Sequence, residues 1–487
     1  MHSSSGTRPL HFNEKCCIIN EHGIGARIKT GAGQTLKKQL YQKEKCYMNF
    51  DDDFIFGAAT SAYQIEGAPY EDDKSASIWD LFCKGEGNTK MQNGDLACDS
   101  YHRYAEDVKI LKDLGAGSYR FSISWPRIFP QEGRYNPKGM QYYKNLIKEL
   151  TDNGIEPFVT LYHWDLPQWA EEKGGWLNRD CATWFAQYSK KCFEELGTQV
   201  TKWITLNEPF CSSILGYAIG LHAPGHKNLQ EALCATHHLL LAHGLAVVEY
   251  QKLSLNSEIG ISLNLCPVCP KSEDINDIAA TNIADGINNR YFLDPVFFGK
   301  YPLDMLSMFI GMGCEYDFAE PGDMNMINQP IDFLGINFYS ANIIEYNSSS
   351  LFKYGAAKTS YKKTDMDWDI RPESLQDILA EVRRYTDLPI YITENGSAWK
   401  DELDKNGTVE DDDRIDYLER HLKEIARLNS DGMNIKGYFA WSLLDNFEWA
   451  EGYSKRFGLV HMDYDTFKRT PKKSYYRYAE IIRNRKV

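Results

Sequence analysis

The chain has 487 residues and a formal net charge of −14 at pH 7. This acidity argues against nucleic acid or an anionic membrane as the main partner, because both attract basic surfaces. Hydrophobic residues make up 43% and charged residues 25% of the chain, which is the composition of a globular protein with a large core. The 12 cysteines are scattered, and in so long a chain this pattern favours reduced thiols over a disulfide framework.

The first 47 residues differ in composition from the rest. They contain eight lysines and arginines against three glutamates, are rich in glycine and serine, and show no hydrophobic periodicity. We interpret residues 1–47 as a disordered basic extension and residues 48–487 as one folded domain. An organelle-targeting leader and an upstream start, with Met48 as the functional start, both remain open. The N-terminus lacks the apolar core of a secretory signal and no apolar run approaches a bilayer-spanning length, so we expect a cytoplasmic protein.

Beyond Met48, short apolar runs alternate with longer amphipathic segments, which is typical of βαβ units and a parallel sheet. Helical spacing is clearest over residues 104–114, where Gly115 is the expected stop, and over 229–251 and 411–428. Eight strands, each followed by a helical stretch, predict an α/β protein with a (β/α)8 TIM barrel. The expected strands are 54–59, 118–124, 156–162, 202–206, 258–263, 332–338, 390–393 and 437–441.

Polar and aromatic side chains lie at the ends of most of these strands. In a parallel barrel, functional groups gather at the carboxyl ends of the strands, so we expect these side chains to meet. They are Gln64 after the first strand, Arg120 within the second, His163 after the third, Asn207 and Glu208 after the fourth, Asn337 and Tyr339 after the sixth, Glu394 after the seventh, and Trp441, Glu448 and Trp449 at or beyond the eighth.

Two of these residues, Glu208 and Glu394, form the pair of carboxylates that glycoside hydrolysis requires. One must protonate the leaving oxygen, and the other must attack or activate water at the anomeric carbon. A nucleophile must stay ionised, so Arg120 is expected to lower the pKa of Glu394 if the two are neighbours. A purely structural ion pair of Arg120 remains an alternative.

The segments around these residues resemble glycoside hydrolase family 1, the β-glucosidase and β-galactosidase family. Among them are Asn207-Glu208-Pro209 and Glu394-Asn395-Gly396. The resemblance extends from about Met48 to the C-terminus, and its matching stretches are 54–67, 120–127, 162–167, 205–209, 337–339, 392–396 and 441–449.

The resemblance implies a retaining mechanism in which Glu394 is the nucleophile and Glu208 the acid/base, without a metal or other cofactor. It also implies a small β-glycoside as the partner, with a terminal β-D-glucosyl residue cleaved from small β-glucosides or cello-oligosaccharides. For the non-reducing sugar, the resemblance implies stacking on Trp441, a hydroxyl contact at Trp449, and hydrogen bonds from Gln64, His163, Asn207 and Glu448. Around the catalytic pair, it implies that Tyr339 supports Glu394 and that Asn337 lies beside the acid/base. Trp368 is expected on the aglycone side.

Several alternatives remain at this stage. One is the branch of the family that cleaves 6-phospho-β-glycosides, in which the position of Glu448 is typically serine. Here the carboxylate of Glu448 would repel the phosphate group. Phe457 stands where that branch has a phosphate-binding tyrosine, although the lysine of that branch is present as Lys455. A non-catalytic sugar-binding relative is a second alternative. The single pair Cys266 and Cys269 could serve zinc or redox chemistry, but two ordinary thiols are the simpler interpretation. The preference among glucose, galactose and fucose, the natural aglycone and a homo-oligomeric state stay open.

Overall fold

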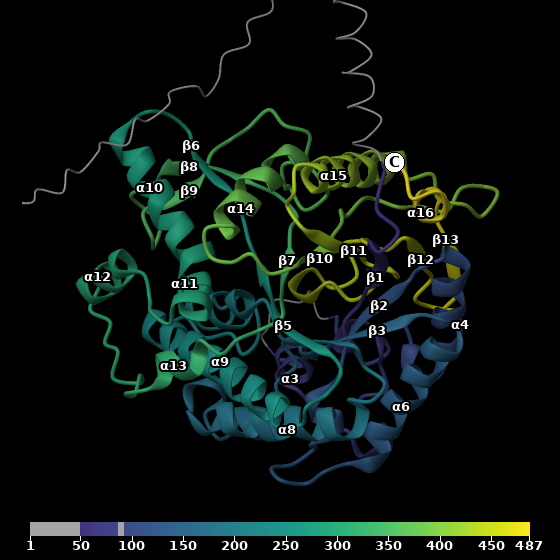
Figure 1. The fold of residues 1–487 in the computed structure, drawn as a ribbon, viewed down its shortest axis with the longest axis horizontal. Helices are drawn as coiled ribbons and strands as arrows, with labels where there is room; N and C mark the ends of the chain where they lie inside the picture. Colours follow the sequence, from purple (N-terminus) through teal and green to yellow (C-terminus); the bar gives the residue numbers. More distant parts are fainter. Residues whose placement is uncertain (1–48, 86–91) are drawn as a thin grey trace, which may run out of the picture. The chain divides into compact units, whose positions relative to one another are not determined.

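The computed structural model describes residues 49–85 and 92–487, and its centre is a closed barrel of eight parallel strands (Figure 1). The extension expected over residues 1–47 lies outside the described residues. The order around the barrel is β1-β11-β10-β7-β5-β4-β3-β2, which confirms the predicted TIM barrel. The strands are β1 (Ile55–Ala59), β2 (Ser118–Ser122), β3 (Glu156–Tyr162), β4 (Lys202–Asn207), β5 (Glu258–Asn264), β7 (Phe333–Asn337), β10 (Ile390–Asn395) and β11 (Ile435–Trp441).

Aromatic rings fill the interior of the barrel below the strand ends. The ring of Phe158 meets those of Phe333, Tyr391 and Phe439 edge to face, with centroids 5.1 to 5.5 Å apart. Gly57 leaves the room that these rings occupy, because a Cβ atom there would lie 2.6 Å from the Phe439 ring. The packed interior fixes the strand ends above it and therefore the side chains that they carry.

Helices surround the strands in the expected alternation (Figure 1). The helix predicted to stop at Gly115 does so, with a left-handed φ of 81° at that residue. The main surrounding helices are α4 (Ser100–Leu114), α6 (Pro137–Asp152), α8 (Asp180–Leu196), α9 (Leu229–Gln251), α10 (Ile275–Asp285), α11 (Tyr291–Phe298), α14 (Leu375–Val382), α15 (Asp412–Ser430) and α16 (Lys473–Asn484).

Helix α9 is, by length and composition, apolar enough to cross a membrane, although polar residues and histidines interrupt its apolar residues, so that it contains no unbroken apolar run of bilayer-spanning length. In the structure, 78% of its most apolar window is buried, and the helix packs against α8 and the segment Cys211–Ile219. Its apolar surface is therefore explained by its place in the protein core.

Three elements outside the alternation were not predicted. A small sheet joins β6 (Val268–Pro270), β8 (Asn342–Tyr346) and β9 (Tyr354–Ala356), and a hairpin joins β12 (Val460–Met462) to β13 (Arg469–Pro471). A π-helix, η3 (Cys211–Ile219), directly follows the Glu208 segment. All are short or irregular, so their sequences carry little periodic signal.

A buried cluster of ion pairs, here called the anchoring cluster, joins the loop after β11 to the beginnings of α15 and α16. Lys472 contacts Asp401 at 2.5 Å and Asp445 at 2.7 Å, and Arg456 contacts Asp445 at 2.8 Å. Arg414 contacts Asp401 and Asp411 at 2.6 and 2.5 Å. Three aspartates thus face three cations, and the loop that bears Glu448 and Trp449 is tied to the barrel wall.

Candidate active site

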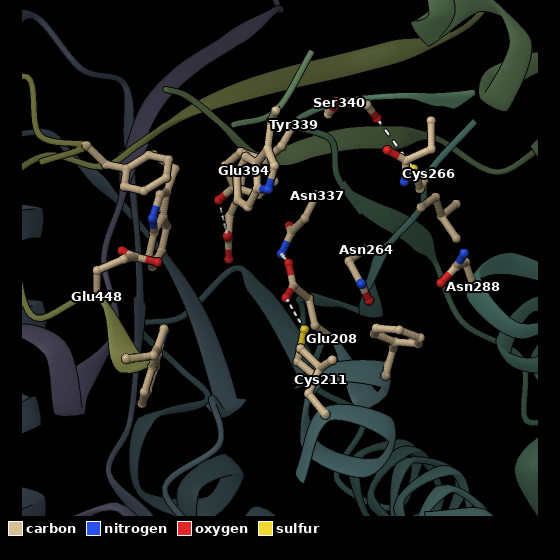
Figure 2. A pocket seen from close by; sticks show the side chains of 18 residues that line it. Glu208, Cys211, Asn264, Cys266, Asn288, Asn337, Tyr339, Ser340, Glu394 and Glu448 are labelled. Atoms are coloured by element: carbon tan, nitrogen blue, oxygen red, sulfur yellow. Dashed lines mark hydrogen bonds between the residues drawn. The ribbon is translucent and has the colours of Figure 1, made fainter. Parts of the chain in front are cut away.

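A cavity of about 350 Å³ opens where the strand ends converge (Figure 2). Its size falls within the usual range of small-molecule sites. Of the residues predicted from the sequence, those that line it are Glu208, Asn337, Tyr339, Trp368, Glu394, Trp441, Glu448 and Trp449. These come from four different strand ends or the loops beyond them, so the barrel brings together residues that are far apart in the chain.

Glu394, on β10, is held by a cation and a phenol. Arg120 Nη1 donates to Glu394 Oε1 at 2.5 Å, and Tyr339 OH donates to Oε2 at 2.6 Å. Both Arg120 and Glu394 are almost fully buried, at 1% and 3% exposure. A buried arginine inside a strand requires such a partner, so the ion pair explains both residues.

Glu208 follows β4 directly and adopts a strained backbone. Its φ is 46°, in the left-handed region that non-glycine residues seldom occupy, and its N–H donates to Ser262 O at 2.9 Å. Asn337 Nδ2 donates to Glu208 Oε1 at 2.6 Å, and Cys211 Sγ donates to Oε2 at 3.0 Å. Within the described part of the chain no cation forms an ion pair or hydrogen bond with this carboxyl group, in contrast to Glu394.

Asn207 connects the two carboxyl groups behind the cavity. Its Oδ1 accepts from Arg120 Nη2 at 2.6 Å and from Asn337 Nδ2 at 2.9 Å. Its Nδ2 lies 3.1 Å from His163 Nε2, and Trp164 Nε1 donates to its carbonyl oxygen at 3.0 Å. These contacts hold both ends of the Asn207 amide and its backbone carbonyl in place.

Burial raises the pKa of both carboxyl groups, by different amounts. For Glu208 the nearby charge of Glu394 adds to the effect of burial, and the pKa rises to about 7. For Glu394 the charge of Arg120 and the hydrogen bond from Tyr339 oppose the rise that burial causes. The sequence predicted a pKa lowered by Arg120; Arg120 does act in that direction, but burial outweighs it, so the pKa of Glu394 is raised.

On one side of the cavity, polar atoms lack protein partners. Glu448 Oε2 and His163 Nδ1 are buried, and within residues 49–85 and 92–487 neither has a hydrogen-bond partner. Burial, with the charges of Glu394 and Glu208, raises the pKa of Glu448 to about 8. Buried polar atoms without partners are rare in proteins and are expected where a ligand supplies the missing hydrogen bonds.

Two tryptophans enclose His163. Its ring is stacked on Trp441, at 5.7 Å and 14°, and on Trp449, at 5.9 Å and 12°. Trp441 and Trp449 are each only 4% exposed, and both line the cavity. Flat rings of this kind match the C–H faces of a pyranose.

Gln64 lies behind the cavity wall. Its side chain is fully buried, accepts from Ser61 Oγ at 2.6 Å, and donates to Asn446 Oδ1 at 3.1 Å and to Phe447 O at 2.8 Å. Gln64 thus supports the segment that precedes Glu448 in this structure. A direct contact between Gln64 and a sugar stays a prediction.

Sequence reasoning missed several residues of the cavity. Asn264 and Asn288 lie on the side away from Glu448, with Glu208 and Glu394 between the two sides (Figure 2). Cys211, at the start of η3, contacts Glu208 directly. The sequence motifs do not indicate these residues, because their positions at the cavity depend on how the loops and the π-helix fold back over the barrel.

The residues that could bind a phosphorylated sugar or a metal contact other groups of the protein. Lys455 binds Asp365 at 2.9 Å, and Phe457 lines the cavity wall. Over the described part of the chain, no group of three or more His, Cys, Asp or Glu side chains could hold a metal ion. Cys266 and Cys269 are free thiols, and each lies within hydrogen-bonding reach of Asn342.

The chain is similar along most of its length to proteins of known family. The profile of the family described as Glycosyl hydrolase family 1 matches residues 46–487. Beta-glucosidase A of Acetivibrio thermocellus is 49% identical over 443 residues, which cover 90% of this chain and 99% of that protein. The crystal structure of the GH1 beta-glucosidase from Exiguobacterium antarcticum B7 has a TM-score of 0.89 and 51% identity, covering 90% of this chain and 99% of the other. The beta-glucosidase from Thermotoga maritima in complex with deoxynojirimycin has a TM-score of 0.87 and 43% identity, covering 90% and 100%. With this match over nearly the whole barrel, the chain belongs to glycosyl hydrolase family 1.

Proposed function

We propose that this family member is a retaining exo-β-glucosidase, which removes the terminal non-reducing β-D-glucosyl residue from small β-glucosides and cello-oligosaccharides. The observation that carries the proposal is a pair of carboxyl groups, Glu208 and Glu394, that line one cavity and have different partners. Glu394 contacts the cation Arg120, whereas Glu208 contacts an amide and a thiol. The named relatives are themselves beta-glucosidases, which supports glucose as the sugar.

In the first step of this mechanism, Glu394 attacks the anomeric carbon as a carboxylate. Arg120 and Tyr339 favour its ionised form against the effect of burial and hold the carboxylate plane, so the attack needs little reorganisation. Glu208 is neutral below its pKa of about 7 and gives its proton to the leaving oxygen as the glycosidic bond breaks. The products of the step are the free aglycone and a glycosyl ester of Glu394.

In the second step, Glu208 is a carboxylate and removes a proton from the water that attacks the ester. Formation of the ester removes the charge of Glu394, which is one of the causes of the raised pKa of Glu208. The pKa of Glu208 therefore falls when it has to act as a base and rises again when Glu394 is released. Two inversions at the anomeric carbon retain its configuration.

The two sides of the cavity support an exo mode of cleavage. Glu448 and the rings of Trp441 and Trp449 offer an acceptor and stacking surfaces for a terminal sugar. On the opposite side, the amides of Asn264 and Asn288 offer hydrogen bonds to a hydroxylated leaving group such as a second glucose (Figure 2). This combination favours short glucosides over a chain that continues past Glu448.

A substrate panel tests the proposal. Purified enzyme is mixed with aryl β-glucosides, aryl β-galactosides, aryl β-fucosides, a 6-phospho-β-glucoside and cellobiose, and the anomer first released is read by NMR. We expect β-glucosides to react fastest and to release β-glucose first. A 2-deoxy-2-fluoro-β-glucoside should label the peptide that contains Glu394. Absence of turnover on the whole panel, or α-glucose as the first product, would contradict the proposal.

We infer further that residues 48–487 form the catalytic unit and that the enzyme acts in the cytoplasm on small β-glycosides. The family profile matches residues 46–487, and the nine cysteines resolved as free thiols suit a reducing compartment. An expressed chain that begins at Met48 should keep the kcat/KM of the whole chain. Cell fractionation checks the location, and size-exclusion chromatography checks whether the enzyme is a homo-oligomer.

A further inference from the structure

The two oxygens of the Glu208 carboxyl group have different neighbours, and this difference identifies the oxygen that handles the proton. Oε1 accepts from Asn337 Nδ2 at 2.6 Å. Oε2 lies 3.0 Å from the Cys211 thiol, and the two groups both line the cavity (Figure 2). An amide N–H can only donate, whereas a thiol can both donate and accept.

The orientation of Asn337 is fixed by its surroundings. Its Oδ1 accepts from Ser262 Oγ at 2.9 Å and from Thr393 Oγ1 at 2.7 Å. The two hydroxyls lie 2.6 Å apart, and the group is buried under the cavity. Its Nδ2 donates not only to Glu208 Oε1 but also to Asn207 Oδ1 at 2.9 Å, an oxygen that accepts from Arg120 as well. A flipped amide would place its oxygen against both of these oxygens, so the Nδ2 group faces the carboxyl.

A neutral carboxyl group accepts a hydrogen bond better at its carbonyl oxygen than at its hydroxyl oxygen. Because Asn337 donates to Oε1, the proton of neutral Glu208 belongs on Oε2. Its neighbour there is the thiol of Cys211, whose side chain is 7% exposed at the cavity wall. Cys211 N donates to Glu208 O at 2.9 Å, so the thiol is attached to the same turn as the carboxyl group that it contacts.

Resting on the function proposed above, we propose that Cys211 is a positioning residue, which accepts from Oε2–H of neutral Glu208, donates to Oε2 of ionised Glu208, and keeps this oxygen directed at the cavity. In glycosylation the Oε2–H bond breaks, an O–H bond forms on the leaving oxygen, and that oxygen takes the electron pair of the glycosidic bond. In deglycosylation Oε2 takes a proton from the attacking water. The thiol exchanges its role between the two steps without moving.

A thiol suits this position because it is a weak donor. A hydroxyl in its place would make a shorter, charge-assisted bond to the carboxylate and favour the ionised form. Cys211→Ser should therefore lower the pKa of Glu208, and Cys211→Ala, which removes the donor, should raise it. Each shift should be about half to one pKa unit, the size expected for one hydrogen bond.

The experiment measures kcat/KM against pH for the whole enzyme and for Cys211→Ser and Cys211→Ala. Two substrates are used: an alkyl β-glucoside, whose leaving oxygen needs the proton, and a dinitrophenyl β-glucoside, whose leaving oxygen does not. We expect the alkaline limb on the alkyl substrate to move down with serine and up with alanine. Near pH 8 the alkyl substrate should lose up to about tenfold with serine, with little change on the dinitrophenyl substrate.

Cys314→Ser is the matched control, because Cys314 is equally buried at 8% exposure and does not line the cavity. Its pH profile should equal that of the unaltered enzyme. Unshifted alkaline limbs in both Cys211 variants, or equal losses on the two substrates, would overturn the proposal. If the unaltered enzyme cleaves neither substrate, or if Glu208→Gln still cleaves the alkyl glucoside, the proposed function itself is wrong.

Discussion

Two groups of buried carboxylates in this molecule differ in how their charge is balanced. In the anchoring cluster, three aspartates face Arg414, Arg456 and Lys472. Of the three glutamates in the cavity, Glu208, Glu394 and Glu448, one has an ion pair with a described cation, which is the pair of Glu394 with Arg120. Burial acts to raise the pKa of Asp445, but Lys472, Arg456 and Arg414 lower it below its ordinary value. Burial raises the pKa of all three glutamates.

The difference separates a structural site from a functional one. In the balanced cluster each carboxylate contacts a cation of the protein, so no charge remains for a ligand to neutralise. Burial and the surplus of negative charge in the cavity raise the pKa of Glu208 to about 7, which favours the neutral form that an acid catalyst requires. Among the described residues, Glu448 Oε2 has no hydrogen-bond partner. The anchoring cluster also holds the loop that bears Glu448, one of the three glutamates of the cavity.

The largest expected effect follows from removal of the carboxylate of Glu394. Glu394→Gln should lower kcat/KM on aryl β-glucosides by roughly 10⁵-fold or more, as loss of a covalent nucleophile does in other enzymes. The protein should stay folded, because the substitution removes a charge from a crowded acidic site. Steady-state kinetics and circular dichroism measure the two effects, and substantial residual activity would reject Glu394 as the nucleophile.

The reverse pattern is expected in the anchoring cluster. Asp445→Asn should lower the free energy of unfolding by about 3–5 kcal/mol, because Lys472 would keep only Asp401 as a carboxylate partner, Arg456 would lose its own, and three cations would face two aspartates. Urea denaturation measures this loss. The remaining folded enzyme should keep its kcat on aryl glucosides at low temperature, and a large loss of kcat without loss of stability would show that the cluster acts directly on catalysis.

The dependence of activity on pH should distinguish Glu208 in the cavity from Asp445 in the anchoring cluster. As the pH rises through about 7, Glu208 loses the proton that the first step needs, so kcat/KM on alkyl glucosides should fall about tenfold per pH unit. Asp445, whose pKa is lowered, stays charged over the same range and contributes no such limb. On a dinitrophenyl glucoside, whose leaving oxygen needs no proton, this alkaline limb should be absent, and a limb of equal size on that substrate would assign it to another group.

The smallest expected effect is a gain in stability. The pKa of Glu448 is raised in the folded state from 4.5 to about 8, so its ionisation destabilises the fold increasingly as the pH rises from about 5 to 8. Glu448→Gln should therefore raise the free energy of unfolding by about 1 kcal/mol at pH 8 and by much less at pH 5. Thermal melts at the two pH values test this, while KM for glucosides should increase.

Much of the barrel could be predicted because its periodic segments are long. The eight strands lie within two residues of their expected bounds, and the helix expected over residues 229–251 is α9. The polar groups at the strand ends were expected to meet because parallel strands in a barrel share one carboxyl face.

The unpredicted parts of the site depend on tertiary burial. The net direction of the pKa of Glu394 follows from the balance of desolvation against Arg120, and a sequence does not give that balance. The inward position of Gln64 depends on where the loop before Glu448 returns to the barrel. The contact between Cys211 and Glu208 depends on a φ of 46° at Glu208 and on the π-helix after it.

Closure of the barrel joins its first strand to its last, since β1 pairs with β11 from Ile55 to Ala59. On the ribosome the ring therefore stays open until almost the whole chain has emerged, with unpaired strand borders exposed in the meantime. A nascent or truncated chain that ends before β11 should thus depend on chaperones and aggregate readily, with no partial activity. Activity therefore requires synthesis of the chain through β11.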